Sequence, residues 1–468
     1  MRRVNRFGCA LALLLCIGSS ARVASANDAA RWERTARRLL EKAVSVRTAA
    51  GYGQVPALAE YLAEQLRGAG FADDEIQMIR FGDTLAMTVR LRGDGSRRPM
   101  LLNTHLDVVD ADPADWDRDP FTLIEEDGYL FARGVADNKV GVAVLVTTLM
   151  RLKSEGFAPT RDVILVLTGD EESSMLSTRG IASRFPDAEF MLNDDDVGGT
   201  LGADGRARVY YVQGAEKTYA SFRLRATNPG GHSSRPTREN AIYELSRALL
   251  RIEAYAFPGE ANELTRAYFR ETARDIGGEL GDAMRRFADD PSDERALAQL
   301  ASDPEYVGLT RTTCVATLLA AGHAENALPQ SATATVNCRI FPGTEIASVR
   351  DRLAEVIGDP RIEIEHLDPE SSIASDASPL RADVMAALRR AVDANFPGLP
   401  IVPKMSAGAS DCMWFRAAGI PSYVVSGLYT NPEDDFWHGL NERIPVDAIP
   451  RSLRHWHVLI SELASRAE

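Results

Sequence analysis

"DVILVLTGDEE" (residues 162–172) is an apolar run that ends in acidic residues, and it follows the helical pattern "NKVGVAVLVTTLMRLKSEG" (residues 138–156). A continuous apolar run of this length is typical of a strand that is buried on both faces. A similar run, "PMLLNTHLD" (residues 99–107), precedes the helix. Strands that alternate with helices predict an α/β fold, with a mostly parallel sheet and helices on both of its faces.

A different pattern occupies the middle of the chain. From residue 214 the segments alternate between polar and apolar residues, and their order predicts β-α-β-β-α-β, the ferredoxin-like unit. A polar stretch at 257–310 interrupts this unit and predicts an added helical excursion. We therefore expect an α/β domain in two parts, 27–213 and 371–468, with an inserted α+β domain at 214–370.

The N-terminal residues have the pattern of a signal peptide. Three arginines precede the apolar run "CALALLLCIG", and Ala24 and Ala26 are the small residues that a signal peptidase requires. We expect residues 1–26 to be removed after Ala26, which would make the protein periplasmic or secreted without a membrane anchor. A lipoprotein signal at Cys16 is disfavoured because the bulky Leu15 precedes it.

Net charge excludes some classes of binding partner, and the cysteine content limits the number of disulfide bonds. Removal of the signal takes away four arginines, so the net charge falls from -14 to -18. Such acidity argues against nucleic acid or an anionic membrane as the partner. The three cysteines that remain, Cys314, Cys338 and Cys412, form no CxxC motif. We expect buried free thiols, with one disulfide as the alternative in an oxidising compartment.

Polar residues follow the predicted strands at the edge where α/β sheets place their sites. His105 and Asp107 are two apart, so on an extended segment they face one way, as a metal ligand and the carboxylate that orients it. Asp137 ends another strand and could bridge two cations with its two oxygens. Taken singly, the first pair also fits a polar loop, and Asp137 also fits a helix cap.

Glu171 and Glu172 are adjacent acids directly after a buried strand. Two such carboxylates are unfavourable neighbours unless positive charge lies beside them, and a metal cluster supplies that charge. Adjacent side chains point in different directions, so one glutamate would bind metal while the other acts as general base. An exposed acidic turn is the alternative. Further acids at residues 194–196, and His438, could complete a second cation site.

Several segments, in order, resemble the M20 family of zinc-dependent metallopeptidases, which includes carboxypeptidases, aminoacylases and dipeptidases. The resemblance covers nearly the whole chain after the signal. The segments that carry it are "NTHLDVVDADPADWDRDPF", "DGYLFARGVADNKVG", "TGDEES", "NPGGHSSRP", "GHAENALPQSATATVNCRIFPG" and "AGASDCMWF". The resemblance implies a zinc exopeptidase-like catalytic domain in the two outer parts and a lid or dimerisation domain in the inserted part. It also implies an amide hydrolase with two zinc ions, for which cobalt or manganese could substitute.

The resemblance also implies a role for each motif residue. Asp137 would bridge the two ions, with Asp107 orienting a metal-bound imidazole and Glu171 acting as general base. The other metal ligands would be His105 and Asp196 on one ion, and Glu172 and His438 on the other. Asp194 and Asp195 are alternatives to Asp196, which is preferred because its Asp-Val-Gly-Gly sequence is most similar to the family's Asp-Glu-Gly-Gly.

Three residues of the inserted segment match substrate-binding positions of the family. His232 would donate to the reaction's oxyanion, in a partner subunit's site or its own. Asn326 and Arg339 would bind the carboxylate end of the substrate, for which a guanidinium is suited because it bonds in a bidentate manner. A surface turn for His232 and a surface ion pair for Arg339 are the alternatives.

Together these patterns predict an exported enzyme that releases an amino acid from small peptides or N-acyl amino acids. A homodimer through the inserted domain is also expected from the resemblance. A non-catalytic relative that only binds such ligands is the rival, but it would need no general base at Glu171. A hydrolase of non-peptide amide or carbamoyl bonds would share all these residues.

Overall fold

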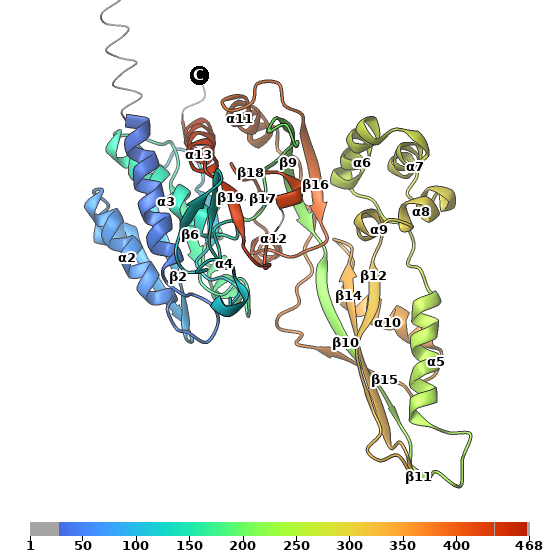
Figure 1. Ribbon diagram of the computed structural model, residues 1–468. Coiled ribbons are helices and arrows are strands. Elements are labelled where there is room, and N and C mark those ends of the chain that lie inside the picture. Colours follow the sequence, from blue (N-terminus) through green and yellow to red (C-terminus); the bar gives the residue numbers. More distant parts are fainter. Residues whose placement is uncertain (1–27, 435, 466–468) are drawn as a thin grey trace, which may run out of the picture.

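A computed structural model of the 468-residue chain describes residues 28–434 and 436–465 (Figure 1). The predicted signal peptide, 1–26, lies outside the described residues. Two sheets organise the rest, a large mixed sheet and a smaller antiparallel one. No helix among the described residues combines the length and the apolar character that crossing a membrane requires.

The large sheet has parallel strands at its centre. β6 (Val163–Thr168), β3 (Met100–His105), β7 (Phe190–Asn193) and β17 (Ser422–Val424) lie side by side and run in one direction. The remaining strands flank these four: β1 (Ile76–Phe81), β2 (Thr84–Leu91), β9 (Ala207–Glu216), β8 (Gly199–Leu201), β18 (Tyr429–Thr430) and β16 (Ile401–Ser406). All residues of β3, β6 and β7 are buried, as their apolar runs predict.

Helices cover both faces of this sheet. The described residues begin with helical residues 28–44, which share one core with α2 (Val55–Gly68), α3 (Lys139–Ser154), α11 (Ala382–Asp393) and α13 (Ala448–Ala464). On the opposite face, α4 (Leu176–Ala182) and α12 (Cys412–Ala417) pack in a second core. The predicted α/β class, with helices on both faces of a sheet whose central strands are parallel, is confirmed.

The second sheet has the strand order β12-β14-β10-β15. Its elements in chain order are β10 (Thr218–Thr227), α5 (Ala241–Ala254), β12 (Thr313–Ala321), β14 (Ser331–Ile340), α10 (Ile346–Ile357) and β15 (Glu363–Leu367). This is the predicted ferredoxin-like order. Only Lys217 separates the end of β9 from the start of β10, so a nearly continuous extended chain joins the two sheets (Figure 1).

Two small sheets complete the strand inventory of the described residues. β11 (Gly231–His232) pairs with β13 (Ala327–Leu328) at the far tip of the second sheet (Figure 1). β4 (Ile124–Glu126), β5 (Tyr129–Phe131) and β19 (Arg443–Pro445) form the other. β19 pairs with β5, which ends a few residues before Asp137 in the chain. This pairing brings the C-terminal segment beside the segment that leads to Asp137.

The polar stretch between α5 and β12 is helical, as expected. It forms α6 (Glu263–Ile276), α7 (Gly278–Asp289), α8 (Glu294–Ala301) and α9 (Pro304–Thr310). These helices share a core with Val402 of β16, and Tyr211 of β9 packs against it. Figure 1 shows them beside β16, so the excursion contacts the large sheet although it is inserted in the smaller unit.

The cysteines correct one prediction. Cys314 of β12 lies opposite Cys338 of β14 in the strand register, and the two form a disulfide bond. Cys412 is a buried free thiol. The expectation of three free thiols is therefore wrong for the first two, because the register of neighbouring strands, which sequence spacing does not show, places them together.

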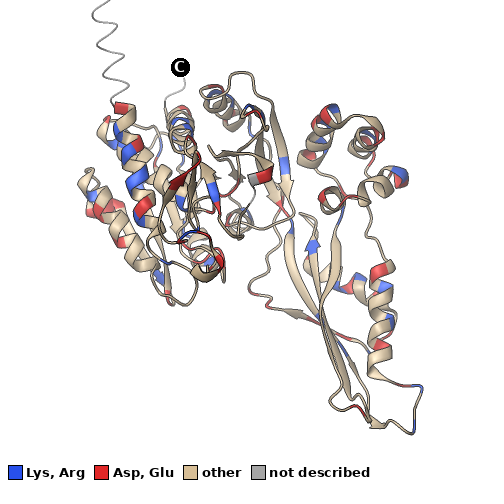
Figure 2. Cartoon of the chain, in the orientation of Figure 1, with Lys and Arg blue, Asp and Glu red and all other residues tan. Residues whose placement is uncertain are grey.

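Acidic and basic side chains are intermixed over the surface. Figure 2 shows red and blue alternating along the outer helices of both parts of the molecule. Many of these groups form exposed ion pairs, such as Arg67 with Asp73 and Arg223 with Glu365. Exposed pairs of this kind contribute little to stability, about 0–1 kcal/mol each.

Candidate metal centre and active site

His105 is the last residue of β3, and its ring is fixed from both sides. Nδ1 lies 3.0 Å from the carbonyl oxygen of Asp107 and 3.5 Å from its carboxylate. Nε2 lies 2.9 Å from Asp137 and 3.3 Å from Asp195. A proton on Nδ1 that is donated to the carbonyl leaves Nε2 as the nitrogen available to a metal ion.

Asp137 lies between the two histidines. Its Oδ1 faces His105, and its Oδ2 lies 3.1 Å from Nε2 of His438. Burial raises the pKa of Asp137, but its bonds to His105 and His438 outweigh burial, so the pKa falls below its usual value. A carboxylate whose two oxygens face two different imidazoles has the arrangement that a bridging ligand needs.

Glu172 completes the half of the centre around His438. The nearer carboxylate oxygen of Glu172 lies 3.0 Å from Nε2 of His438. Hydrogen bonds to Asp137 and Glu172 raise the pKa of His438 to about 10. The His438 side chain is 54% exposed, so this half of the centre faces solvent.

Glu171 points to the other half of the centre. One of its carboxylate oxygens lies within 4.8 Å of the nearest ligand atoms of His105 and Asp195. Burial, followed by the charge of Asp195, raises the pKa of Glu171 well above its usual value. In contrast to Glu172, its carboxylate forms no hydrogen bond with another described residue.

Asp107 explains how two adjacent glutamates are held apart. Its Oδ1 accepts the backbone N–H of Glu171 and its Oδ2 accepts that of Glu172, both at 3.0 Å. The carboxylate therefore fixes the turn that follows β6. Asp107 was expected to orient the His105 ring through its carboxylate. In the structure the shorter contact with Nδ1 of His105 is made by the backbone carbonyl oxygen of Asp107.

The three consecutive aspartates have three different surroundings. Asp195 faces His105, whereas Asp196 forms an ion pair with Lys404. Asp194 points into the interior, where burial raises its pKa to about 7. Asp195 rather than Asp196 therefore faces His105, because the backbone after β7 turns its side chain toward β3. The assignment of a metal ligand among these aspartates stays a prediction.

A buried ion pair between Arg133 and Glu442, which no sequence motif indicated, supports the centre. Glu442 accepts the backbone N–H groups of Gly134, Ala136 and Asp137 at 2.7–3.1 Å, and pairs with Arg133 at 2.8 Å. Arg133 also donates to the carbonyl oxygens of His438 and Gly439. This pair thus ties the turn of Asp137 to the turn of His438. A lone glutamate in "NERIP" gives no sequence signal for such a role.

Replacing Glu442 with Ala should destabilise the protein strongly. The change removes a buried carboxylate and leaves Arg133 and three backbone N–H groups without their acceptor. Loss of one partner of a buried pair costs about 3–5 kcal/mol. Urea unfolding measures the effect. The matched control is Glu126→Ala, which removes an exposed pair with Arg118 and should leave stability nearly unchanged; equal losses would contradict the proposed support.

The structure separates two expected substrate residues from the centre. His232 and Asn326 are exposed and lie at the tip of the second sheet, where Asn326 accepts the backbone N–H of Ser233. Figure 1 shows this tip, at β11, away from β6 of the large sheet. Within one chain, the structure does not bring these two residues to His105.

Arg339 lies much nearer the large sheet. It is the penultimate residue of β14, and its guanidinium lies 3.4 Å from the carbonyl oxygen of Ala407 and 4.8 Å from the ring centre of Tyr219. Burial lowers its pKa. It forms no ion pair with another described residue. A half-buried cation without a counterion is suited to binding a carboxylate.

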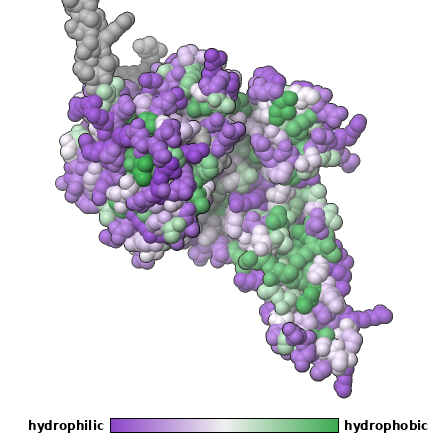
Figure 3. Space-filling model, in the orientation of Figure 1, coloured by the Kyte–Doolittle hydropathy of each residue, from purple (hydrophilic) through white to green (hydrophobic). Residues whose placement is uncertain are grey.

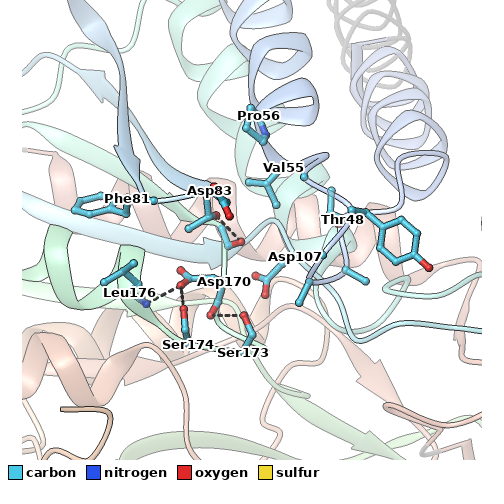
Figure 4. A pocket seen from close by; sticks show the side chains of 18 of the residues that line it. Thr48, Val55, Pro56, Phe81, Asp83, Asp107, Asp170, Ser173, Ser174 and Leu176 are labelled. Atoms are coloured by element: carbon cyan, nitrogen blue, oxygen red, sulfur yellow. Dashed lines mark hydrogen bonds between the residues drawn. The ribbon is translucent and has the colours of Figure 1, made fainter. Parts of the chain in front are cut away.

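A cavity of about 690 Å³ adjoins Asp107 and the turn of the two glutamates. Figure 4 shows Val55, Pro56 and Leu176 around it, with Asp170 bonded to Ser174 and to the backbone of Leu176. Arg80 and Asp83 also line it. The cavity therefore combines apolar walls with free charges.

The donor set fits a pair of divalent cations. Imidazole nitrogens and carboxylate oxygens converge on Asp137 from both sides, and burial raises the pKa of Glu172 and of Asp195. Buried carboxylates this close together need compensating positive charge, and such a donor set is typical of zinc. His105, Glu172 and Asp195 follow parallel strands of an α/β sheet, and together with Asp137 and His438 they indicate a metal-dependent hydrolase.

Comparison with known proteins specifies the class. The sequence profile of peptidase family M20/M25/M40 matches residues 101–462. The chain belongs to this family, and it is accordingly an enzyme of the metallopeptidase type.

Individual relatives agree with this assignment. Human N-fatty-acyl-amino acid synthase/hydrolase PM20D1 is 28% identical over 78% of this chain and 74% of its own length. Probable carboxypeptidase S-like 2 of Dictyostelium discoideum is 27% identical over 78% of this chain and 72% of its own. The crystal structure of the M20 family metallo-carboxypeptidase Sso-CP2 from Sulfolobus solfataricus covers 92% of this chain and 99% of its own, with a TM-score of 0.68 and 18% identity, and therefore has the same fold.

Proposed function

We propose that this protein binds two zinc ions and hydrolyses an amide bond to release an amino acid from a small peptide or an N-acyl amino acid. The observation that carries the proposal is the position of Asp137 between His105 and His438. Asp195 would complete the set around His105, and Glu172 that around His438. When bound, the ions would polarise the scissile carbonyl and acidify a water molecule.

Glu171 is the proposed general base. Its carboxylate lies beside the centre, is unengaged by hydrogen bonds within the described chain, and has a raised pKa. A raised pKa suits the task, because the group must accept a proton from the attacking water and then give it to the leaving nitrogen. Asp107 positions this carboxylate through the backbone N–H of Glu171.

Arg339 and Asn326 are the proposed ligands of the substrate's carboxylate end, and His232 the proposed oxyanion donor. Arg339 is the nearest to the large sheet of the three, beside Ala407. His232 and Asn326 would act in the site of a second subunit, or after the two sheets close, since they lie at the tip of the second sheet. The relatives named as an N-fatty-acyl-amino acid hydrolase and as a carboxypeptidase support substrates with a free carboxylate.

The direct test is a screen of the purified, metal-loaded protein for amino-acid release. Dipeptides, N-acyl amino acids and N-carbamoyl amino acids should be compared at equal concentration. Release from the first two classes supports the proposal. Release from N-carbamoyl substrates alone would assign the protein to the other hydrolase class that shares these residues.

Replacing Arg339 with Ala should lower kcat/KM chiefly through KM. A hydrogen bond to a charged group contributes about 1.5–3 kcal/mol, which corresponds to about tenfold to a hundredfold. Steady-state kinetics on a substrate with a free carboxylate and on its amide measure the effect. Arg223→Ala, on the neighbouring strand but paired with Glu365, is the control and should leave KM unchanged. An equal loss on the amide would remove the proposed role of Arg339.

We further propose that the protein acts after export, in the periplasm or outside the cell. The N-terminal signal pattern motivates this proposal, and the Cys314–Cys338 disulfide supports it, because such bonds persist in oxidising compartments. N-terminal sequencing of the protein recovered from the exported fraction tests it. A chain that begins at Asn27 is the expected result, and an uncleaved chain in the cytosol would refute it.

A homodimer through the second sheet is the corresponding assembly proposal. β12 is an edge strand, and its Val315, Leu318 and Leu319 are 56–68% exposed. Figure 3 shows an apolar patch over this part of the molecule. Long apolar edge strands are normally covered. The sedimentation velocity of the full chain tests the proposal, and a monomer at micromolar concentration would refute it.

A further inference from the structure

A second cavity, of about 430 Å³, lies where the helical excursion meets the large sheet. Tyr268 of α6 and Glu305 of α9 line it from the excursion. Tyr211 of β9 and Lys404 of β16 line it from the sheet. The excursion thus supplies one wall of a cavity whose other walls belong to the large sheet.

Two residues that line this cavity are sequence neighbours of proposed metal ligands. Asp196 lines it and directly follows Asp195, which faces His105. Trp437 lines it and directly precedes His438. One proposed ligand from each half of the centre therefore has a chain neighbour in the cavity wall.

Three of the lining residues are aromatic, and among the described residues the lining holds no cation that lacks an acidic partner. The rings of Tyr211, Tyr268 and Trp437 contribute to the walls. The charge of Lys404 is neutralised by Asp196, and its ammonium lies 5.3 Å from the ring centre of Tyr211. Glu305 adds a negative charge. A carboxylate-bearing group would be repelled here, whereas a neutral apolar chain would bury its surface against aromatic rings.

The larger cavity beside Asp107 is less suited to such a chain. It is lined by Arg80 and Asp83, and neither forms an ion pair with another described residue. Hydroxyl groups of Thr48 and Ser173 add further polar atoms. Burial of an apolar chain there would remove water from two unpaired charges, whereas among the described residues the smaller cavity has one, Glu305, so the larger cavity is the less favourable of the two.

We propose that the cavity between the excursion and the large sheet binds the acyl group of the substrate, as a linear apolar chain, and that Tyr268 sets the chain length that the enzyme accepts. This inference rests on the proposed function, since it assigns one end of the proposed substrate. It gives the excursion a specific role, which is to supply the outer wall of the acyl site.

Binding to the metal-free protein tests the inference apart from turnover. N-acetyl, N-butanoyl, N-hexanoyl and N-octanoyl forms of one amino acid are titrated into the chelator-treated full chain by calorimetry. Each methylene that becomes fully buried should tighten binding by up to about fourfold. Tyr268→Ala and Thr200→Phe, which open and fill the cavity respectively, should each lower the preference for octanoyl over acetyl by about tenfold or more. The conservative variant Tyr268→Phe should retain it.

Leu176→Ala, in the cavity beside Asp107, is the matched control and should keep the octanoyl preference. The inference is overturned if the wild-type series is flat, or if Leu176→Ala loses the preference while Thr200→Phe keeps it. Thermal melts show whether Tyr268→Ala remains folded; Thr200→Phe, on the sheet side, supplies the test if it does not. A normal binding series with no turnover by the zinc-loaded enzyme would refute the proposed hydrolysis and support the acyl site.

Discussion

Replacing Glu171 with Gln should lower kcat by about 10²–10⁴-fold, which is the usual contribution of a positioned general base. The amide has nearly the same shape, and the backbone N–H that bonds to Asp107 is unchanged. We therefore expect the metal content to persist while turnover is lost. Zinc analysis by mass spectrometry and single-substrate kinetics on the same preparation measure both quantities.

Glu172→Gln is the informative control for this experiment. Glu172 faces His438 rather than the open side of the centre, so its neutralisation should reduce zinc content as well as activity. The pair of variants thus separates a base from a ligand at adjacent positions. If Glu171→Gln loses zinc, or retains full activity, the assignment of the base is wrong.

Removal of metal should abolish activity completely, and zinc should restore it. The described residues bring the carboxylates of Asp137, Glu172 and Asp195 against only two imidazoles, so without cations their negative charges lack compensation. The metal ligands would remain in place but could neither polarise a carbonyl nor acidify water. Activity after chelation, and after addition of zinc, cobalt or manganese, measures this.

Thermal unfolding provides a readout of metal binding that does not depend on turnover. A ligand that binds only the folded state stabilises it, by about 2.7 kcal/mol at a hundred times its Kd. Zinc should therefore raise the Tm of the chelated wild type, and raise it less in His438→Ala. Indifference of both activity and Tm to chelation would refute the metal centre.

The sequence was informative where a pattern is local. Apolar runs ending in His105 and before Glu171 predicted buried parallel strands, and the structure has β3 and β6 at these positions. The ends of β3 and β6 place His105 and Glu172 beside Asp137 and His438, which come from turns elsewhere in the chain. Their roles as ligands and base stay predictions until metal is measured.

Other features depend on geometry that spacing does not encode. Asp195 and Asp196 are chemically identical neighbours, and only the turn after β7 directs one toward His105. The disulfide of Cys314 and Cys338 depends on the register of β12 against β14. The excursion was expected as helices, but its packing against β16 is a long-range contact that no local pattern predicts.

The Arg133–Glu442 pair also determines how late in synthesis the metal centre can form. Its two residues are separated by 309 positions, and it fixes both the turn of Asp137 and the turn of His438. A chain emerging from the ribosome from its N-terminus holds most of the acidic residues of the centre long before its last histidine appears. Only a nearly finished polypeptide can assemble the whole centre, so nascent and prematurely terminated chains lack part of it.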